Sequence, residues 1–352
     1  MASDHSLLAH LVPKLTRGVE DAVTDALAFI LNESKPCRDA LVDMVSVGDR
    51  RLASVANART QVVASEGERL DLVAYDTAGS NRLIIESKFW APLQDGQARR
   101  YVGHLADDGL AVLLFVAPEV RHETLWVKIA RQFEHPSELK LGSTRQVGNM
   151  IVADVVNGDK RIALMGWDTL LAGLTNADSS MDANLQQLHC LALAQDEAAF
   201  APLHAEDLNA TVPRRLMAFN RLVDGVASRG AGEGWMTNKG LRAVPGRDGY
   251  LRFIGFCDTD GERLIELALY VSLKRWADLG TTPLWLRIWH KQAIDLVDLK
   301  HRLAEPGWLP AWSEPNWLWV PIELPLGVEY EDTLDSATAQ VKRVRDIVVE
   351  MA

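Results

Sequence analysis

The sequence predicts an α/β fold, in which helices flank a mixed sheet, followed by a C-terminal α+β domain. Three observations in the N-terminal part predict this sheet and its helices. Residues 17–32 carry apolar side chains at helical spacing. Two β-rich runs, 69–76 and 81–88, are joined by Thr-Ala-Gly-Ser, which is typical of a hairpin turn. Residues 110–117 are continuously apolar, as expected of a strand that is buried on both faces.

The other elements of the N-terminal part follow in chain order. We expect a short strand at 60–65, helices at 93–107 and 120–134, and a strand at 149–156. A strand-to-helix step, Arg-Ile-Ala-Leu-Met-Gly-Trp-Asp-Thr-Leu-Leu-Ala-Gly-Leu, then completes this part of the chain. Because helices alternate with strands in this order, we expect a first domain at residues 1–175 with helices on both sides of its sheet.

The C-terminal part has a different pattern. Two helices are expected within residues 176–230, which we interpret as a helical connector; they are 182–199 and 212–229. An α+β domain is expected at 231–352, and its role in substrate or partner recognition stays open. Its β-rich runs are 249–257, 264–273, 283–289 and 316–324, and its final helix is 333–350. Tryptophans on these strands either form an aromatic surface for bases or a partner, or fill a core, and we favour the core.

Composition limits the classes of function. The chain has 352 residues and a formal net charge of −11, which argues against a protein that coats nucleic acid through a general basic excess. No apolar run reaches the roughly 18 residues of a membrane helix, and the N-terminus lacks the pattern of a signal peptide. The cysteines, Cys37, Cys190 and Cys257, lack metal-ligand spacing. We therefore expect a cytoplasmic protein with reduced thiols.

Charged residues within the predicted hairpin form the constellation that carries chemistry. A turn centred between Ala78 and Gly79 places Asp71 directly opposite Glu86, and opposed side chains lie about 5 Å apart on one face. Lys88, two residues beyond Glu86, points to the same face. Two carboxylates at this separation repel each other, and a bound Mg²⁺ or Mn²⁺ relieves that repulsion. The patch therefore predicts metal-assisted phosphodiester chemistry, in which Lys88 acts on the attacking water or on the developing charge.

The spacing of these residues resembles that of the PD-(D/E)XK nuclease superfamily. The matching residues are Asp71 and Glu86-Ser87-Lys88, followed by Gln97-Ala-Arg-Arg-Tyr101, which is similar to the Gln-x-x-x-Tyr motif of the RecB-like and lambda-exonuclease-like branches. The resemblance covers roughly the first third of the chain. It implies a restriction-endonuclease-like αβββαβ core. The chain departs from the pattern at Leu70, where the family name has proline, although this position varies widely in the superfamily.

The resemblance also implies a role for each site residue. Glu20, Asp71 and Glu86 would bind the metal, with the backbone carbonyl of Ser87 as a further ligand. Asp21 and Asp25 are alternatives to Glu20 on the same predicted helix. Lys88 would be catalytic.

The helix that follows the hairpin would hold the substrate. Gln97 and Tyr101 would support the site and contact the nucleic acid, and Arg99 and Arg100 would contact phosphates. The two motif residues are four apart and therefore share one helix face.

The resemblance implies a Mg²⁺- or Mn²⁺-dependent nuclease that hydrolyses DNA, in bacterial phage defence, restriction or DNA repair. RNA stays open as the substrate, and a homodimer or a partner protein of a defence system is a further expectation. One alternative is a catalytically silent binding or sensing module that keeps the nuclease fold. Another is that Asp71, Glu86 and Lys88 form an ordinary cross-strand salt-bridge cluster. Gln97 and Tyr101 would then be plain helix-surface residues. Placing charges inside apolar strands is costly, which favours a functional site.

Overall fold

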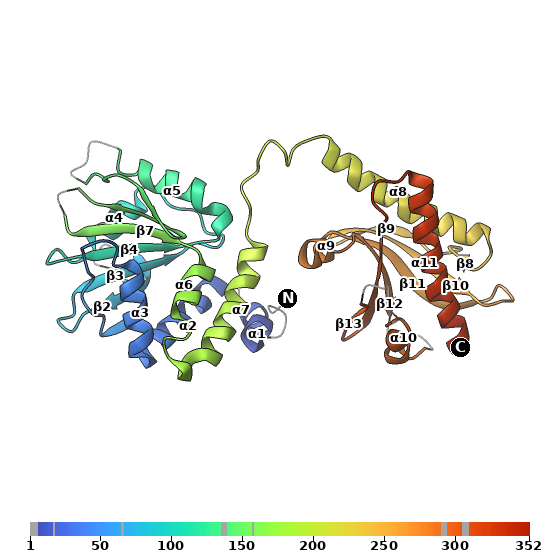
Figure 1. Ribbon diagram of the computed structural model, residues 1–352, viewed down its shortest axis with the longest axis horizontal. Coiled ribbons are helices and arrows are strands. Elements are labelled where there is room, and N and C mark those ends of the chain that lie inside the picture. The colour runs from blue at the N-terminus through green and yellow to red at the C-terminus, as the bar shows by residue number, and fades with distance from the viewer. Residues whose placement is uncertain are drawn as a thin grey trace. The chain divides into compact units, whose positions relative to one another are not determined.

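The computed structural model describes residues 6–16, 18–64, 67–134, 139–156, 158–289, 294–304 and 310–352. The chain divides into two compact units, unit 1 at Met1–Leu203 and unit 2 at His204–Ala352. Each unit has its own sheet and its own hydrophobic core (Figure 1). Arg17 and Ser65, which were expected in the first helix and the first strand, lie outside the described residues.

The described part of unit 1 contains a seven-stranded mixed sheet in the order β1-β2-β3-β4-β7-β6-β5. β3 pairs with β4 and β4 with β7 in parallel, and the other neighbours are antiparallel. The strands are β1 (Asn57–Val63), β2 (Arg69–Tyr75), β3 (Asn81–Ser87), β4 (Ala111–Val116), β5 (Arg145–Val147), β6 (Met150–Asp154) and β7 (Lys160–Met165). The predicted mixed sheet flanked by helices is thus confirmed.

Helices cover both faces of this sheet. One face is covered by α1 (Leu7–Leu15), α2 (Val19–Glu33), α3 (Lys35–Val45), α6 (Trp167–Leu174) and α7 (Asp182–Ala198). The other is covered by α4 (Gln97–Gly103) and α5 (His122–Arg131) (Figure 1). Two short 3₁₀ turns, η2 (Glu119–Arg121) and η3 (Ser179–Met181), precede α5 and α7. β4 lies between the two layers with every residue buried, which explains its unbroken apolar sequence.

The register of the β2–β3 hairpin agrees with the expectation from its turn. Leu72 pairs with Ile85 and Val73 with Ile84, so continuing the register by one pair sets Asp71 opposite Glu86. The turn is closed by the Asp76 carboxylate, which accepts hydrogen bonds from the amides of the turn at 2.8 and 2.9 Å. A bulge between Ala74 and Tyr75 absorbs the uneven turn without disturbing the pairing nearer the site.

Three helices of unit 1 differ from the expectation. α1 and α3 were not expected, although Ser34 caps α3 by accepting from the Cys37 amide and Pro36 lies in its first turn. α4 is shorter than the expected helix at 93–107. It begins after Gly96, which adopts a left-handed conformation with φ +71°, and it ends at Gly103.

The described part of unit 2 contains an antiparallel sheet in the order β13-β14-β12-β11-β10-β8, with β9 beside β10. Its strands are β8 (Met236–Thr237), β9 (Ala243–Gly246), β10 (Gly249–Cys257), β11 (Arg263–Ser272), β12 (Leu284–Trp289), β13 (Trp312–Glu314) and β14 (Trp317–Ile322). Its helices are α8 (Thr211–Gly232), α9 (Leu273–Leu279), α10 (Leu296–Arg302) and α11 (Tyr330–Met351). α8 and α11 pack on one face of the sheet.

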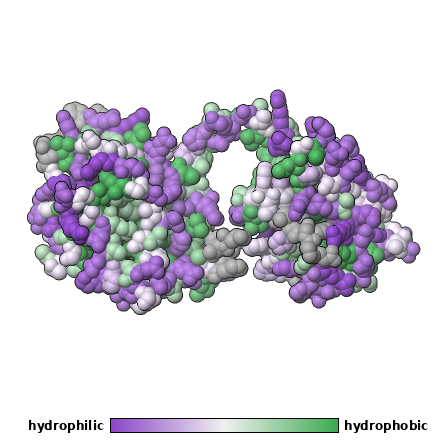
Figure 2. Space-filling view, in the orientation of Figure 1, coloured by the Kyte–Doolittle hydropathy of each residue, from purple (hydrophilic) through white to green (hydrophobic). Residues whose placement is uncertain are grey.

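The tryptophans of unit 2 divide between two environments. Trp285 and Trp319 are buried in a cluster on the sheet face opposite α8 and α11, as the preferred core role requires. Trp317 is partly exposed, and Trp289, which packs against it at 4.9 Å between ring centroids, is exposed. Figure 2 shows hydrophilic and hydrophobic residues interspersed over the visible face of both units.

The structure corrects the expected connector at 176–230. α7 contacts α1, α2 and α6 and therefore belongs to unit 1, whereas α8 packs on β10, β11 and α11 in unit 2. The reason is that each helix buries its apolar side chains in the core of its own unit, Leu188 in the first and Val223 in the second. The boundary consequently lies at 203/204. None of the described helices combines the length and hydropathy that a bilayer crossing requires.

Candidate active site

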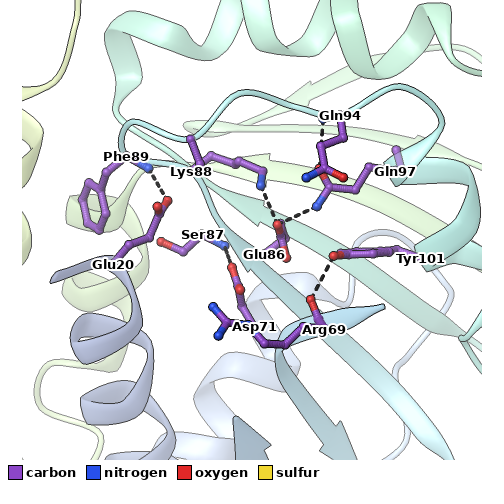
Figure 3. Close-up of polar contacts among 12 residues, drawn as sticks. Glu20, Arg69, Asp71, Glu86, Ser87, Lys88, Phe89, Gln94, Gln97 and Tyr101 are labelled. Carbon is purple, nitrogen blue, oxygen red and sulfur yellow. Dashed lines mark hydrogen bonds and ion pairs between the residues drawn. The ribbon is translucent and has the colours of Figure 1, made fainter. Parts of the chain in front are cut away.

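Asp71 of β2 and Glu86 of β3 lie close together near the end of the hairpin that is away from the turn, and each accepts a hydrogen bond from a donor of the chain (Figure 3). One oxygen of Asp71 accepts a hydrogen bond from the Ser87 amide at 3.0 Å. Oε1 of Glu86 accepts from Nζ of Lys88 at 2.5 Å and from Nε2 of Gln97 at 2.7 Å. The three residues that the hairpin register brings to one face therefore do converge, together with a glutamine from α4.

Glu20 reaches the same site from α2. Its Oε1 accepts a hydrogen bond from the Phe89 amide at 2.8 Å, directly after Lys88 (Figure 3). Asp21 also lies near the hairpin. It contacts Gln61 of β1 and Arg69 of β2 at 3.3 Å, and its charge helps to raise the pKa of Asp71, whereas Asp25 is exposed. Of the three acids, Glu20 is the one that accepts a hydrogen bond from the segment after Lys88.

The pKa values of all three carboxyl groups are raised. Burial is the largest cause for each of Glu20, Asp71 and Glu86. For Glu86, burial and the neighbouring charge of Asp71 raise the pKa to about 8, against the opposing effect of Lys88. The site thus brings three acidic groups close to Lys88, and the charge of Arg121 also acts on Glu20.

The alternative of a cross-strand salt-bridge cluster expects ion pairs among Asp71, Glu86 and Lys88, and the structure contains one of them. Lys88 and Glu86 do form a buried ion pair, with side chains 6% and 4% exposed. Asp71 forms no ion pair with any described residue, and a side-chain hydrogen bond with Glu86 lowers the pKa of Asp71 and raises that of Glu86. Oε2 of Glu86 is buried and has no hydrogen-bond donor among the described residues. A buried acceptor without a partner costs free energy, so this oxygen is suited to a proton or a cation.

The donor set fits a hard divalent cation. Mg²⁺ and Mn²⁺ prefer carboxylate and carbonyl oxygens, which Glu20, Asp71, Glu86 and the Ser87 backbone offer. Among the described residues, no three His, Cys, Asp or Glu side chains are already grouped to hold a metal ion. One oxygen of each carboxylate is held by a donor of the chain, and the unpartnered Oε2 of Glu86 is the atom that such an ion would satisfy.

Gln97 and Tyr101 are buried rather than on the helix surface. Besides its bond to Glu86, Gln97 accepts a hydrogen bond from the Gln94 amide at 3.1 Å through Oε1. The Tyr101 hydroxyl donates to the Arg69 carbonyl at 3.1 Å (Figure 3). Burial and the charge of Glu86 raise the pKa of Tyr101 to about 12. Both residues therefore hold the hairpin and its carboxylates in place.

The two arginines of α4 have different surroundings. Arg100, expected to contact substrate, forms an ion pair with Glu68 and donates to the Asp95 carbonyl at 2.7 Å. His104 also contacts Glu68, at 2.9 Å. Arg99 instead lines a pocket between α4 and α5. The geometry thus favours Arg99, rather than Arg100, as the residue of this helix that is available to a phosphate.

Arg121 is a site residue that the sequence did not reveal. Its guanidinium donates to the carbonyls of Lys88 and Phe89 at 2.5 and 2.6 Å, and to that of Ala91 at 3.2 Å. Phe89 is further held by stacking on Trp167, with ring centroids 5.4 Å apart. Arg121 therefore fixes the segment that follows the catalytic lysine candidate. A single arginine after a buried strand carries no motif from which this role could be read.

No family model matches the chain, and neither does any curated protein or solved structure. The function of the site is therefore argued from its residues and their geometry.

Proposed function

We propose that the protein is a nuclease of the PD-(D/E)XK type, which hydrolyses phosphodiester bonds of DNA with the help of Mg²⁺ or Mn²⁺. The observation that carries the proposal is the excess of buried carboxylates over cations at Asp71 and Glu86, with Oε2 of Glu86 lacking a donor among the described residues. The order α2, α3, β1, β2, β3, α4, β4 supports the assignment of an αβββαβ core in which α3 is an additional helix.

Glu20, Asp71, Glu86 and the Ser87 carbonyl would hold the cation. When bound, such an ion lowers the pKa of a coordinated water and offsets charge on the scissile phosphate. The residues of the chain supply the positioning. The Ser87 amide orients Asp71, and Gln97 orients Glu86.

Lys88 would act on the attacking water or on the charge that develops at the phosphate. Its ammonium is buried and held at 2.5 Å from Glu86, so it is confined to the site rather than free in solvent. The segment behind it is restrained by Arg121. A cationic donor held in this way stabilises a transition state without having to reorganise during the reaction.

A catalytically silent sensing module is the second candidate function. It has no need for partly uncompensated carboxylates in a buried position, because their desolvation destabilises the fold. We therefore favour the enzyme. DNA is preferred over RNA as substrate on the basis of the resemblance, and a role in phage defence, restriction or DNA repair rests on the same basis.

The proposal is tested by incubating the purified chain with linear DNA, circular DNA and RNA in the presence of Mg²⁺, Mn²⁺ or EDTA. We expect cleavage of DNA with either metal and none with EDTA. Lys88→Ala should abolish cleavage, whereas Lys35→Ala, which removes an exposed lysine from an ion pair with Asp39, should leave it unchanged. Absence of cleavage on every substrate, or equal cleavage by Lys88→Ala, would refute the proposal.

A further inference from the structure

A pocket of about 550 Å³ lies between α4 and α5, on the same side of the sheet as Gln97. Three of the side chains that line it are cationic, Arg99, Lys128 and Arg131, and Asp95 is the single acid among the described residues of the lining. Gln132 also lines the pocket. We call these five residues the basic pocket.

The three cations of the basic pocket have no carboxylate partner among the described residues. Among the described residues, Arg99, Lys128 and Arg131 form no ion pair, and Nε of Arg99 is buried without a hydrogen-bond acceptor. Several cations elsewhere on unit 1 have carboxylate partners, for example Lys35 with Asp39 and Arg51 with Asp43. In a chain with a net charge of −11, an unpaired group of three cations in one concave site is suited to an anion.

The basic pocket is connected to the candidate active site through hydrogen bonds. The Gln132 side chain donates to the Gln94 carbonyl at 2.9 Å and accepts from the Ala98 amide at 2.9 Å. The Gln94 amide in turn donates to Gln97 at 3.1 Å, and Gln97 donates to Glu86 at 2.7 Å. The segment 94–98 therefore forms part of the pocket and also supports Glu86.

We infer that the basic pocket binds a backbone phosphate of the nucleic acid, away from the bond that is cut. This inference rests on the proposed function for the identity of the anion. Arginine and lysine contacts to phosphates provide affinity without reading sequence. Such a local site explains how an acidic protein holds a polyanion without a broadly basic surface. It also assigns the phosphate contact on α4 to Arg99, because Arg100 is occupied by Glu68.

The inference is tested by binding in EDTA, so that cleavage is not required. Labelled single-stranded and duplex DNA would be titrated with the wild-type chain and with Arg99→Gln, Lys128→Gln and Arg131→Gln at several salt concentrations. We expect weaker binding of each variant, with the slope of log K against log [salt] reduced by roughly 0.7 to 0.9 for each phosphate that is no longer neutralised. Arg214→Gln and Arg215→Gln on α8 are matched controls, because these arginines are exposed and lie outside the pocket.

The binding results test the basic pocket independently of cleavage at the candidate active site. If wild type binds DNA in EDTA and the pocket variants show lower affinity and a smaller salt slope, the inference holds even where no cleavage is found. If the pocket variants bind with wild-type affinity and slope, or are weakened no more than the α8 controls, the inference is wrong, whatever the cleavage assay shows. Inorganic phosphate is the competitor that distinguishes a free anion from a strand. If millimolar phosphate displaced DNA from the wild type and from the pocket variants to the same extent, that result would also contradict the inference.

A kinetic readout adds a second criterion where cleavage occurs. A contact that holds substrate and transition state equally raises KM when it is removed and leaves kcat unchanged. We therefore expect the pocket variants to raise KM for DNA without lowering kcat. A fall in kcat at constant KM would place these residues in the chemical step and would contradict a binding role.

Discussion

The Glu86 carboxyl group experiences opposing electrostatic influences. Burial and Asp71 favour its protonated form, while Lys88 favours the carboxylate. Its two oxygens also differ, since Oε1 accepts from Lys88 and Gln97 and Oε2 has no donor among the described residues. A side chain in this position is expected to oppose folding whenever it is charged and no cation is bound.

The stability of the metal-free protein should therefore depend on pH in a defined direction. The ordinary pKa of Glu86 is 4.5, and its pKa in the folded protein is about 8. The stabilisation that this raised pKa contributes is therefore fully present below pH 4.5 and is lost as the pH rises towards 8. Glu86→Gln, which keeps an acceptor for Lys88 and Gln97, should reduce this loss by up to about 1.4 kcal/mol for each pH unit in that window. Urea denaturation in EDTA between pH 5 and 8 measures the free energy of unfolding of the variant and of the wild type.

The matched control for this experiment is Glu33→Gln, which alters an exposed glutamate of α2. It should leave the pH dependence of the wild type unchanged. If Glu86→Gln showed the same slope of unfolding free energy against pH as the wild type, the raised pKa of Glu86 would be refuted.

Individual residues show where sequence reasoning succeeded and where it did not. Asp71, Glu86 and Lys88 were predicted as neighbours because a hairpin register follows from its turn. Arg99 and Arg100 were not distinguishable, since the partner that occupies Arg100 is Glu68, which precedes β2 and lies far from it in sequence. Arg121 was missed because it binds backbone carbonyls, which no residue pattern indicates.

At the scale of elements, the β2–β3 hairpin is the structure on which the site depends. A shift of its register by one residue would turn Asp71 to the opposite face. The turn that sets the register is held by Asp76, whose second oxygen accepts from the buried Arg82 at 2.7 Å. Arg82 also contacts Asp108 at 2.9 Å.

Asp76→Ala should destabilise unit 1 substantially. The substitution removes the acceptor of two turn amides. It also leaves Arg82 with one ion-pair partner, the exposed Asp108. Breaking a buried ion pair in this way costs on the order of 3 kcal/mol of folding stability. Urea denaturation of the full chain measures the loss. Asp43→Ala, which breaks an exposed ion pair with Arg51, serves as control and should change stability by less than about 1 kcal/mol. Equal stability of the two variants would contradict this account of the turn.

The elements were predictable where periodicity was strong and less so where single residues decide the ends. Strands β2, β3 and β4 follow the expected ranges closely, because their apolar runs are long and bounded by turn residues. α4 proved shorter than expected, since the left-handed Gly96 starts it late. α3 was missed although Ser34 and Pro36 mark its start and its buried residues, Cys37, Leu41, Val42 and Val45, recur at helical spacing.

At the scale of the whole molecule, the two units each have a core of their own, and most residues between α7 and α8 are exposed. The expected boundaries at 175 and 231 were wrong in position because an amphipathic helix does not reveal which sheet it covers. Both α7 and α8 have apolar residues, and only the folded cores show that these residues belong to different units.

Limited proteolysis should therefore cut between the two units. Phe200, Leu203 and Leu208 are 61%, 61% and 75% exposed in this segment, so chymotrypsin is expected to cleave there first. Mass spectrometry should find two stable fragments that correspond to units 1 and 2. First cleavage inside either unit, or rapid loss of both fragments, would contradict the division of the chain at 203/204.

The proposed nuclease activity requires Asp71 and Glu86 to hold a divalent cation. The most direct test is the cleavage rate of labelled DNA at saturating Mn²⁺ for wild type, Asp71→Asn, Glu86→Gln and the exposed control Asp43→Asn. We expect Asp71→Asn and Glu86→Gln each to lower the rate by about a hundredfold or more, and Asp43→Asn to cleave like wild type. Wild-type rates in both site variants, or no cleavage by the wild type itself, would contradict the proposal.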